Sequence, residues 1–174
     1  MDVSMHDKPI LKLTNIIFSF VGYYKFLSNF HTHEEITYNK MKANNVEHLY
    51  QASKATCKED KEYVLTAETP NRAKVRGKLI ECRKDWEDVK INVMRDLLKL
   101  KFEIPDLKQQ LINTKGIVII EGNYWKDTFW GVYEGEGKNM LGELLMELRR
   151  ELTGEPVIEF NKEEVYGRIR FKRP

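Results

Sequence analysis

The sequence predicts a mainly α-helical domain with a few short β-strands, an α+β fold. Five leucines between Leu141 and Leu152 recur at helical spacing, and the segments 86–102 and 105–116 begin with residues typical of helix starts. The strand-like segments are short and do not alternate with the helices, which argues against a parallel Rossmann-type sheet. With 174 residues, the chain is expected to form a single domain over 1–174.

In the first half of the chain, short strands are expected before two helices. Residues 10–21 are rich in β-branched and aromatic side chains and predict one or two strands. Residues 25–45 predict a loop with a short strand near 35–38. A helix is predicted over 46–58, and another over 70–83, where a threonine cap precedes a proline that suits the first helical position.

In the second half, the apolar run at 117–121 predicts a short buried strand, and the glycines of 122–138 predict a loop. The leucine-rich helix that follows is expected to stop at Gly154. A C-terminal extension over 153–174 is expected to form strands, because it contains two strand-like stretches: 156–160 and 165–171.

Composition excludes several classes of protein. Lys and Arg total 29 and Asp and Glu 27, so the net charge of +2 does not suit a protein that coats duplex DNA. The apolar run near 16–21 is far shorter than the about 20 residues that span a bilayer, and no secretory signal core is visible. Neither the cysteines, Cys57 and Cys82, nor the histidines have metal-ligand spacing. We therefore expect a cytoplasmic protein with no metal and no membrane partner.

A polar stripe on the helix at 46–58 is the first candidate site. At 100° per residue, Glu47, Gln51 and Lys54 fall within about 60° of arc, next to an apolar face. This pattern fits a carboxylate at the rim of a pocket with a cation nearby. It also fits an ordinary solvated helix face, and spacing alone leaves both interpretations open.

Two further patterns lie around residue 80. Residues 72–84 carry six basic side chains against Glu81, which suits phosphate or a solvated helix. Trp86 lies one helical turn from Lys90, so its indole offers a stacking surface beside a charge. A core tryptophan with a snorkelling lysine explains that pair equally.

The segment 121–131 places two carboxylates and four aromatic side chains in one predicted loop. Exposed aromatic groups are unfavourable unless something covers them, so Asp127 and Trp130 are candidate contacts for a sugar or a nucleotide. The alternative is a loop folded into the core. Downstream, Asn139 follows two glycines and fits either anion binding or helix capping.

Seven short motifs occur in one order along the chain: F-L-S-N-F (26–30), E-H-x-Y-Q-A-x-K (47–54), P-x-x-A-K-x-x-G (70–77), R-K-x-W-E-x-V-K-x-x-V-M (83–94), L-x-x-K-F (98–102), D-x-x-W-G (127–131) and G-K-N-x-L-G-x-L-L-M-E-L-R (137–149). Together they resemble the YbiA-like N-glycosidase family, also called NADAR. The resemblance covers about residues 16–152. It implies a compact, orthogonal helical domain that hydrolyses the N-glycosidic bond of a ribose.

The resemblance also implies which residues form the site. Glu47, Trp86 and Asp127 match family positions implicated in activity, with Glu47 as the carboxylate near the anomeric carbon. Asp127 would hold ribose hydroxyls or share the base role, and Trp86 would stack on the base or flank the sugar. Further matches are expected to bind substrate: Asn29, Lys54, Arg83, Lys90, Trp130, Gly131 and Asn139. No metal and no cofactor is implied.

Family substrates include phosphoribosylamino-pyrimidine intermediates of riboflavin synthesis, and some relatives remove ADP-ribose from guanine. The expected partner is therefore a small nucleotide-like or ADP-ribosyl substrate, with ADP-ribosylated DNA as an alternative. A module that binds ADP-ribose or an NAD-like ligand without turnover is a further alternative. Val46 and residues 132–134 depart from the family pattern, which bears on the choice of substrate more than on the type of reaction.

Overall fold

A computed structural model describes residues 15–170 of the chain. These residues divide into two compact units, which we call the terminal unit and the central unit. Each is assembled from separate stretches of the chain: 15–19, 116–146 and 155–170 form the terminal unit, and 20–115 with 147–154 the central unit. Helix α6 (Met140–Thr153) begins in the terminal unit and ends in the central one.

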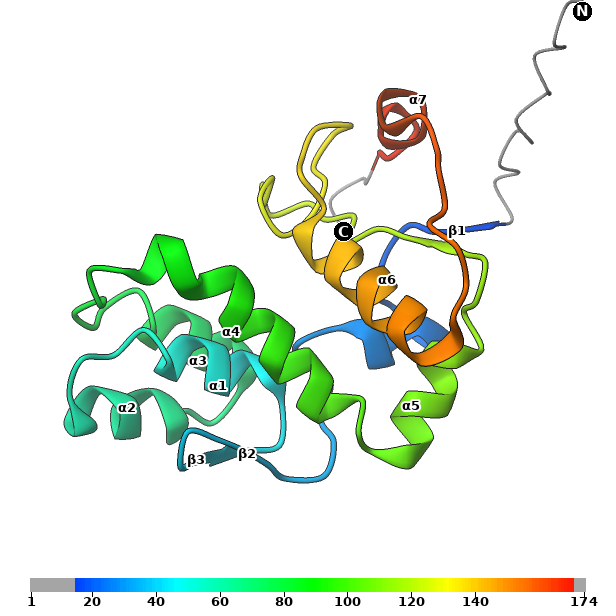
Figure 1. The fold of residues 1–174 in the computed structure, drawn as a ribbon. Helices are drawn as coiled ribbons and strands as arrows, with labels where there is room; N and C mark the ends of the chain where they lie inside the picture. The colour runs from blue at the N-terminus through cyan, green and yellow to red at the C-terminus, as the bar shows by residue number, and fades with distance from the viewer. Residues whose placement is uncertain (1–14, 171–174) are drawn as a thin grey trace, which may run out of the picture. The chain divides into compact units, whose positions relative to one another are not determined.

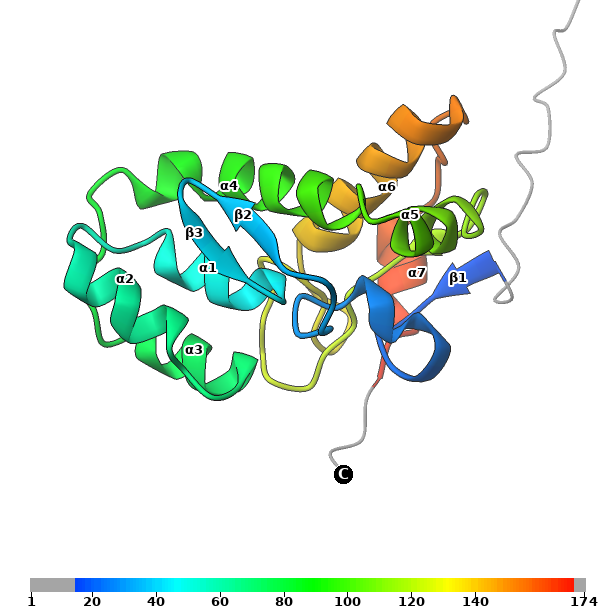
Figure 2. The ribbon, with the colours of Figure 1, turned by 90° about the horizontal axis from the view of Figure 1, so that it is seen from below.

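The central unit is built around a short helix whose seven residues are all buried, α1 (Val46–Ala52). Helices α2, α3 and α4 and strand β3 contact α1 (Figures 1 and 2). The remaining elements follow in chain order: η2 (Gly22–Leu27), β2 (Ile36–Tyr38), β3 (Met41–Ala43), α2 (Lys58–Leu65), α3 (Pro70–Arg76), α4 (Trp86–Lys101) and α5 (Pro105–Ile112).

The hairpin of β2 and β3 is antiparallel, with Ile36 opposite Ala43 and Tyr38 opposite Met41. Its two turn residues, Asn39 and Lys40, both have positive φ (48° and 65°), as a two-residue hairpin turn of the type that matches strand twist requires. The hairpin contacts α1 through β3 and α4 through β2 (Figure 2). The strand expected near 35–38 is therefore confirmed as β2, while β3 was not predicted.

Two predicted helices end earlier than their sequence pattern suggests. The helix expected over 46–58 stops at Ala52, and the one expected over 70–83 stops at Arg76. Ala55 instead forms an antiparallel bridge with Cys82, and the Arg83 amide donates to the Lys54 carbonyl at 2.8 Å. Pairing between two segments distant in sequence replaces helix propagation at both ends.

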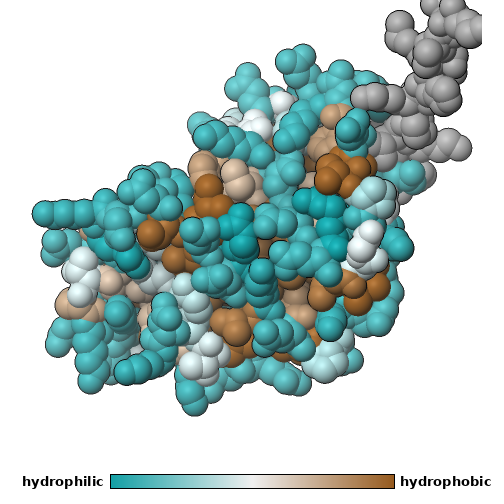
Figure 3. Space-filling view, in the orientation of Figure 1, coloured by the Kyte–Doolittle hydropathy of each residue, from teal (hydrophilic) through white to brown (hydrophobic). Residues whose placement is uncertain are grey.

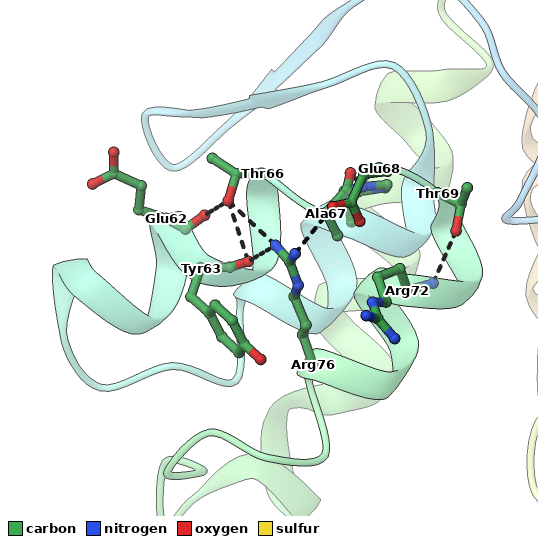
Figure 4. Close-up of polar contacts among 9 residues, drawn as sticks. Glu62, Tyr63, Thr66, Ala67, Glu68, Thr69, Arg72 and Arg76 are labelled. Atoms are coloured by element: carbon green, nitrogen blue, oxygen red, sulfur yellow. Dashed lines mark hydrogen bonds and ion pairs between the residues drawn. The ribbon is translucent and has the colours of Figure 1, made fainter.

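Arg76 joins α2 to α3 at the corner that Figure 4 shows. Its guanidinium donates to the Tyr63 carbonyl at 2.8 Å and lies 4.8 Å from the centre of the Tyr63 ring. It also pairs with Glu68 at 3.4 Å, while the Thr69 hydroxyl caps α3 by accepting from the Arg72 amide at 3.1 Å. The end of α3 is thereby fixed against the end of α2.

In the terminal unit, the buried strands β1 (Ile16–Ile17) and β4 (Val118–Ile119) pair in parallel. Hydrogen bonds extend the pairing beyond the strands, since the Ile120 amide donates to the Ile17 carbonyl at 2.9 Å. The strands expected within 10–21 and 117–121 are confirmed at these residues. Residues 10–14 lie outside the described part of the chain.

The prediction of strands in the C-terminal extension is wrong for the described residues. Residues 156–160 form no regular element, and α7 (Lys162–Gly167) follows, while residue 171 lies outside the described part. The Asn161 side chain accepts from the Glu164 amide at 3.0 Å, and two acidic residues occupy the first turn. A cap followed by acidic residues favours a helix start over the β propensity of the segment.

The α+β fold class is confirmed, with helices as the dominant elements of residues 15–170. The face drawn in Figure 3 is mostly hydrophilic, with hydrophobic side chains in small separate groups, as the 32% share of charged residues suggests. No helix within the described range is both long and apolar enough to cross a membrane.

Candidate active site

A buried carboxylate on α1 is the centre of the candidate site in the central unit. Glu47 is 6% exposed, and its Oε1 accepts a hydrogen bond from Gln51 Nε2 at 2.7 Å. The Glu47 amide donates to the Asn29 carbonyl at 3.1 Å. One helical turn separates Glu47 from Gln51, so the spacing read from the sequence does place both side chains on one face. That face is buried rather than solvated.

Gly77 lies directly against Gln51. A Cβ atom added at Gly77 would be 2.1 Å from Gln51 Oε1 and 2.9 Å from its Cβ, so only glycine fits there. Gln51 is 4% exposed, and its Oε1 has no hydrogen-bond partner among the described residues. Gln51 belonged to the polar stripe predicted as the first candidate site but was assigned no role there, and Gly77 was noted only within the motif at 70–77. The signals for them were the spacing of Gln51 from Glu47 and a glycine at the end of a basic helix.

The Lys54 ammonium group lies beside two aromatic rings that contact each other. Its Nζ is 5.6 Å from the centre of the Tyr50 ring and 5.8 Å from that of Trp86, and the two rings are 5.0 Å apart. Burial lowers the pKa of Lys54, and the neighbouring cations Lys78 and Lys74 lower it further, whereas the charge of Glu47 acts to raise it. The site therefore holds a partly desolvated ammonium group close to its carboxylate.

Trp86 is the first residue of α4 and is 7% exposed. Its indole packs against Tyr50 and the Lys54 ammonium group. The structure thus brings Trp86, Lys54 and the helix that carries Glu47 together in the central unit. That Trp86 stacks on a base or flanks a sugar stays a prediction.

The two other predicted cations of this unit are ion-paired. Arg83 makes two contacts to the Asp85 carboxylate, at 2.5 and 2.7 Å, and this hydrogen bonding raises the pKa of Arg83 and lowers that of Asp85. Lys90 pairs with Glu87. An anionic ligand that binds either residue has to compete with a neighbouring carboxylate.

Asn29 also borders Glu47, through its backbone carbonyl. Its Nδ2 contacts Met94 Sδ at 3.5 Å, which is a weak acceptor, and its Oδ1 is buried without a partner in the described part of the chain. A buried amide oxygen without a partner suits a ligand that brings a donor.

The basic run at 72–84 does not form one helical patch. Because α3 ends at Arg76, Lys78 and Arg83 lie beyond the helix, and Arg76 uses its guanidinium to join α2 to α3. The run was predicted to suit phosphate or a solvated helix, and the single helical face that both interpretations assumed is not formed by these residues.

The other predicted residues belong to the terminal unit. Asp127 Oδ1 accepts from the amides of Phe129 at 3.0 Å and Trp130 at 2.8 Å, which leaves Oδ2 outside these hydrogen bonds. The Asn123 side chain closes the preceding loop, because it accepts from the Asp127 amide at 3.0 Å and donates to the Asp127 carbonyl at 2.7 Å. Trp130 is half-buried and packs edge-on against Phe129, with ring centres 5.0 Å apart.

Gly131 and Asn139 have structural contacts that the sequence did not indicate. A Cβ atom at Gly131 would be 2.2 Å from the Glu121 carbonyl oxygen. Asn139 is fully buried, where its Nδ2 donates to the Ile119 carbonyl and its Oδ1 accepts from the Glu121 amide, both at 2.9 Å. Both ends of the Asn139 side-chain amide are therefore hydrogen-bonded to backbone groups. Direct contact of Asn139 with substrate stays a prediction.

Histidine is used structurally near Glu47. His48 Nδ1 lies 2.9 Å from Asn45 Oδ1, and its Nε2 lies 2.8 Å from the Ala67 carbonyl oxygen. Within residues 15–170, no three His, Cys, Asp or Glu side chains are placed to share a metal ion.

Comparison with known proteins gives consistent relatives. The riboflavin biosynthesis protein PYRR of Arabidopsis thaliana is 45% identical over 109 residues, which is 58% of this chain and 18% of that protein. The N-glycosidase YbiA of Escherichia coli K12 is 38% identical over 111 residues, or 62% of this chain and 69% of that one. The match thus spans less than a fifth of the plant relative's length.

A solved structure and a family model agree with these matches. The NMR structure of the E. coli protein YbiA superposes with a TM-score of 0.70 at 33% identity and covers 87% of this chain and 93% of that chain. The model of the NADAR domain matches residues 18–153. Since that match covers most of the chain, and both the fold and the ordered motifs accord with it, the chain belongs to the NADAR domain family.

Proposed function

We propose that this protein is an N-glycosidase that hydrolyses the bond between a base and a ribose. The observation that carries the proposal is the buried Glu47 carboxylate, hydrogen-bonded to Gln51 and close to the Lys54 ammonium group. The relative named N-glycosidase YbiA supports this reaction class. The NADAR family assignment supports it as well.

The reaction needs a group that stabilises positive charge on a sugar ring. When the C1′–N bond breaks, the electron pair leaves with the base and the ring becomes oxocarbenium-like. Glu47 stabilises that charge and accepts a proton from the attacking water, whose oxygen forms the new C1′–O bond. The departing base nitrogen takes up the proton that Glu47 removed from the water, which restores the carboxylate. This hydrolysis requires no metal and no cofactor.

We propose a ribosylamino-pyrimidine 5′-phosphate as the substrate. The relatives named riboflavin biosynthesis proteins, from two plants and from Vibrio vulnificus, support this class. Lys54, with Lys74 and Lys78 near it, supplies positive charge that suits a phosphate. Arg83 and Lys90 would add to that charge once a phosphate competes with their carboxylate partners.

The remaining residues would act on the sugar and the base. In this proposal Trp86 flanks the sugar or stacks on the base. That Asp127 and Trp130 also contact the substrate stays a prediction from the family resemblance. Asn29 accepts a hydrogen bond from the ligand at its unpartnered Oδ1. The two free, exposed cysteines, Cys57 and Cys82, fit a reducing compartment such as the cytoplasm.

The test is a turnover assay without added metal. Purified protein is incubated with a ribosylamino-pyrimidine 5′-phosphate, and in parallel with an oligonucleotide that carries ADP-ribosyl-guanine. Mass spectrometry follows the release of base and sugar. We expect release from the first substrate, and we expect Glu47→Gln to lose at least about 100-fold in kcat while it keeps its fold and its ligand binding.

Other outcomes have distinct meanings. Release from the oligonucleotide alone overturns the substrate class and retains the reaction type. Binding of ADP-ribose with no release from either substrate overturns the enzymatic proposal in favour of a binding module. Near-normal turnover by Glu47→Gln removes that residue from the mechanism.

A further inference from the structure

We propose that Gln51 is a positioning residue for the hydrolysis, which holds the Glu47 carboxylate in its reactive orientation, and that Gly77 sets the position of the Gln51 amide. The inference rests on the proposed function and deepens it. Neither residue touches the reacting atoms in this proposal. Gln51 acts through Glu47, and Gly77 acts through Gln51.

The hydrogen bond to Glu47 decides which way the Gln51 amide faces. An ionised carboxylate only accepts hydrogen bonds, so the amino end of the amide must point to Glu47 Oε1. With both side chains nearly excluded from solvent, water cannot replace this donor at little cost. A hydrogen bond to an ionised group is also stronger than one between neutral groups. Fixing Oε1 in this way also fixes where the second carboxylate oxygen of Glu47 stands.

The position of the oxygen end of the Gln51 amide is limited by the backbone at Gly77. Gln51 Oε1 is buried against Gly77, where even a methyl group would meet it at 2.1 Å. Gly77 follows Arg76 directly, and the contacts of Arg76 with Tyr63 and Glu68 fix that end of α3 (Figure 4). The amide is therefore confined between a carboxylate on its own helix and the end of a neighbouring helix.

Confinement of this kind matters for chemistry rather than for binding. A general base must reach its water within a few tenths of an ångström, and a displacement of about 1 Å can cost about 100-fold in rate. We therefore expect loss of the Gln51 donor to lower kcat and to leave KM nearly unchanged. If Gln51 served only to bind substrate, its loss would instead raise KM and leave kcat nearly unchanged.

The first test compares two Gln51 variants with a matched control. Gln51→Leu removes the donor, and Gln51→Glu keeps the side-chain shape while replacing the donor by an acceptor. We expect both to lower kcat for the ribosylamino-pyrimidine phosphate by about 10- to 100-fold, with KM within about threefold. The control is Gln109→Leu, because Gln109 makes the same i,i+4 type of contact, to Asn113 at 2.9 Å, on the exposed face of α5.

The second test is a double-mutant cycle with Gly77→Ala. In the parent chain, the added methyl group must displace the Gln51 amide, so kcat is expected to fall as in Gln51→Leu. In a Gln51→Ala background, the same change should cost less, because the closest contact, with Oε1 at 2.1 Å, is gone and only the contact with the Cβ of residue 51 at 2.9 Å remains. Gly167→Ala serves as a glycine control, since a Cβ atom there meets nothing within 4 Å.

A measurement independent of turnover keeps the outcomes separable. The side-chain amide resonance of Gln51, assigned by its loss in Gln51→Leu, should shift in Glu47→Gln as the carboxylate acceptor disappears. An unshifted resonance, unchanged kcat in both Gln51 variants, or additive effects in the cycle each overturn the positioning role. Failure of the parent protein to release any base overturns the proposed function instead, whatever the resonance does.

Discussion

Lys54 shows how burial of a charged side chain in the central unit costs stability. Its ammonium group is partly desolvated beside Tyr50 and Trp86, and its pKa lies below the ordinary value of 10.5. In the window between the folded and the unfolded pKa, the unfolded chain binds more protons. The contribution of this residue to stability therefore rises with pH through that window, and below it the charge is a net cost.

Replacement of Lys54 by a neutral side chain of similar shape should therefore stabilise the protein. We expect Lys54→Met to raise the melting temperature at neutral pH by about 2 °C, and the gain to shrink as pH rises to the ordinary lysine value. Calorimetry at pH 7 and pH 10 measures this, with exposed Lys58→Met as the control. A loss of stability that is equal at both pH values would contradict the assignment of burial as the main cause.

Asn139 stabilises the terminal unit through hydrogen bonds of its side chain to the backbone. It has a φ of +51°, and its amide satisfies the Ile119 carbonyl and the Glu121 amide. Asn139→Ala leaves two buried backbone groups without partners and places alanine in a left-handed conformation. We expect a loss of about 3 kcal/mol in unfolding free energy in urea. The exposed Asn113→Ala change is expected to stay within about 0.5 kcal/mol.

How far the sequence predicts the site depends on how local each contact is. Glu47 and Gln51 share α1, so helical spacing alone predicted their common face, whereas Lys54 lies two residues beyond the end of α1. The partners of Asn139 are about twenty residues away in the chain, so spacing offered only a cap or an anion site. Gly77 follows the same rule, because its contact with Gln51 exists only once α3 packs on α1.

At the scale of elements, packing decides where helices end. Thr69 and Pro70 start α3 as the sequence predicted, because a cap and a helical φ are local properties. The early ends at Ala52 and Arg76 come from the bridge of Ala55 with Cys82, which no local pattern announces. The starts of α1, α3, α4 and α5 were therefore predicted more accurately than the ends of α1 and α3, whereas α2 and α7 were not predicted as helices.

The contact between α2 and α3 should depend on Arg76. Arg76→Met keeps the aliphatic stem and removes the hydrogen bond to the Tyr63 carbonyl, the ion pair with Glu68 and the ring contact. We expect a loss of about 1–3 kcal/mol in unfolding free energy, mostly from the carbonyl bond. Arg72→Met, on the exposed side of α3, is the control. Equal losses in the two variants would show that Arg76 has no special role at this corner.

At the scale of the whole chain, the C-terminal extension belongs to the fold although the family match ends at residue 153. Helix α7 buries Val165 and Tyr166, and Ile169 follows as a third buried side chain. Burial raises the pKa of Tyr166 to about 12. Residues 155–170 of the extension are thus an integral part of the terminal unit.

Removal of residues 161–174 should destabilise the protein. Loss of three buried side chains is expected to lower the unfolding free energy by about 3 kcal/mol or more, measured by urea unfolding. Val157→Ala serves as a control within the extension, since Val157 is 66% exposed. A truncated chain as stable as the full one would show that α7 contributes nothing to the fold.

The parallel pairing of β1 with β4 has a consequence for synthesis on the ribosome. Ile16 and Ile17 leave the exit tunnel about a hundred residues before their partners, Val118 and Ile119. Pairing between such distant segments carries a high loop-closure entropy and high contact order, and so forms late. The β1 segment therefore stays unpaired and its apolar side chains stay exposed while most of the central unit emerges. We expect chaperones to bind this segment during translation.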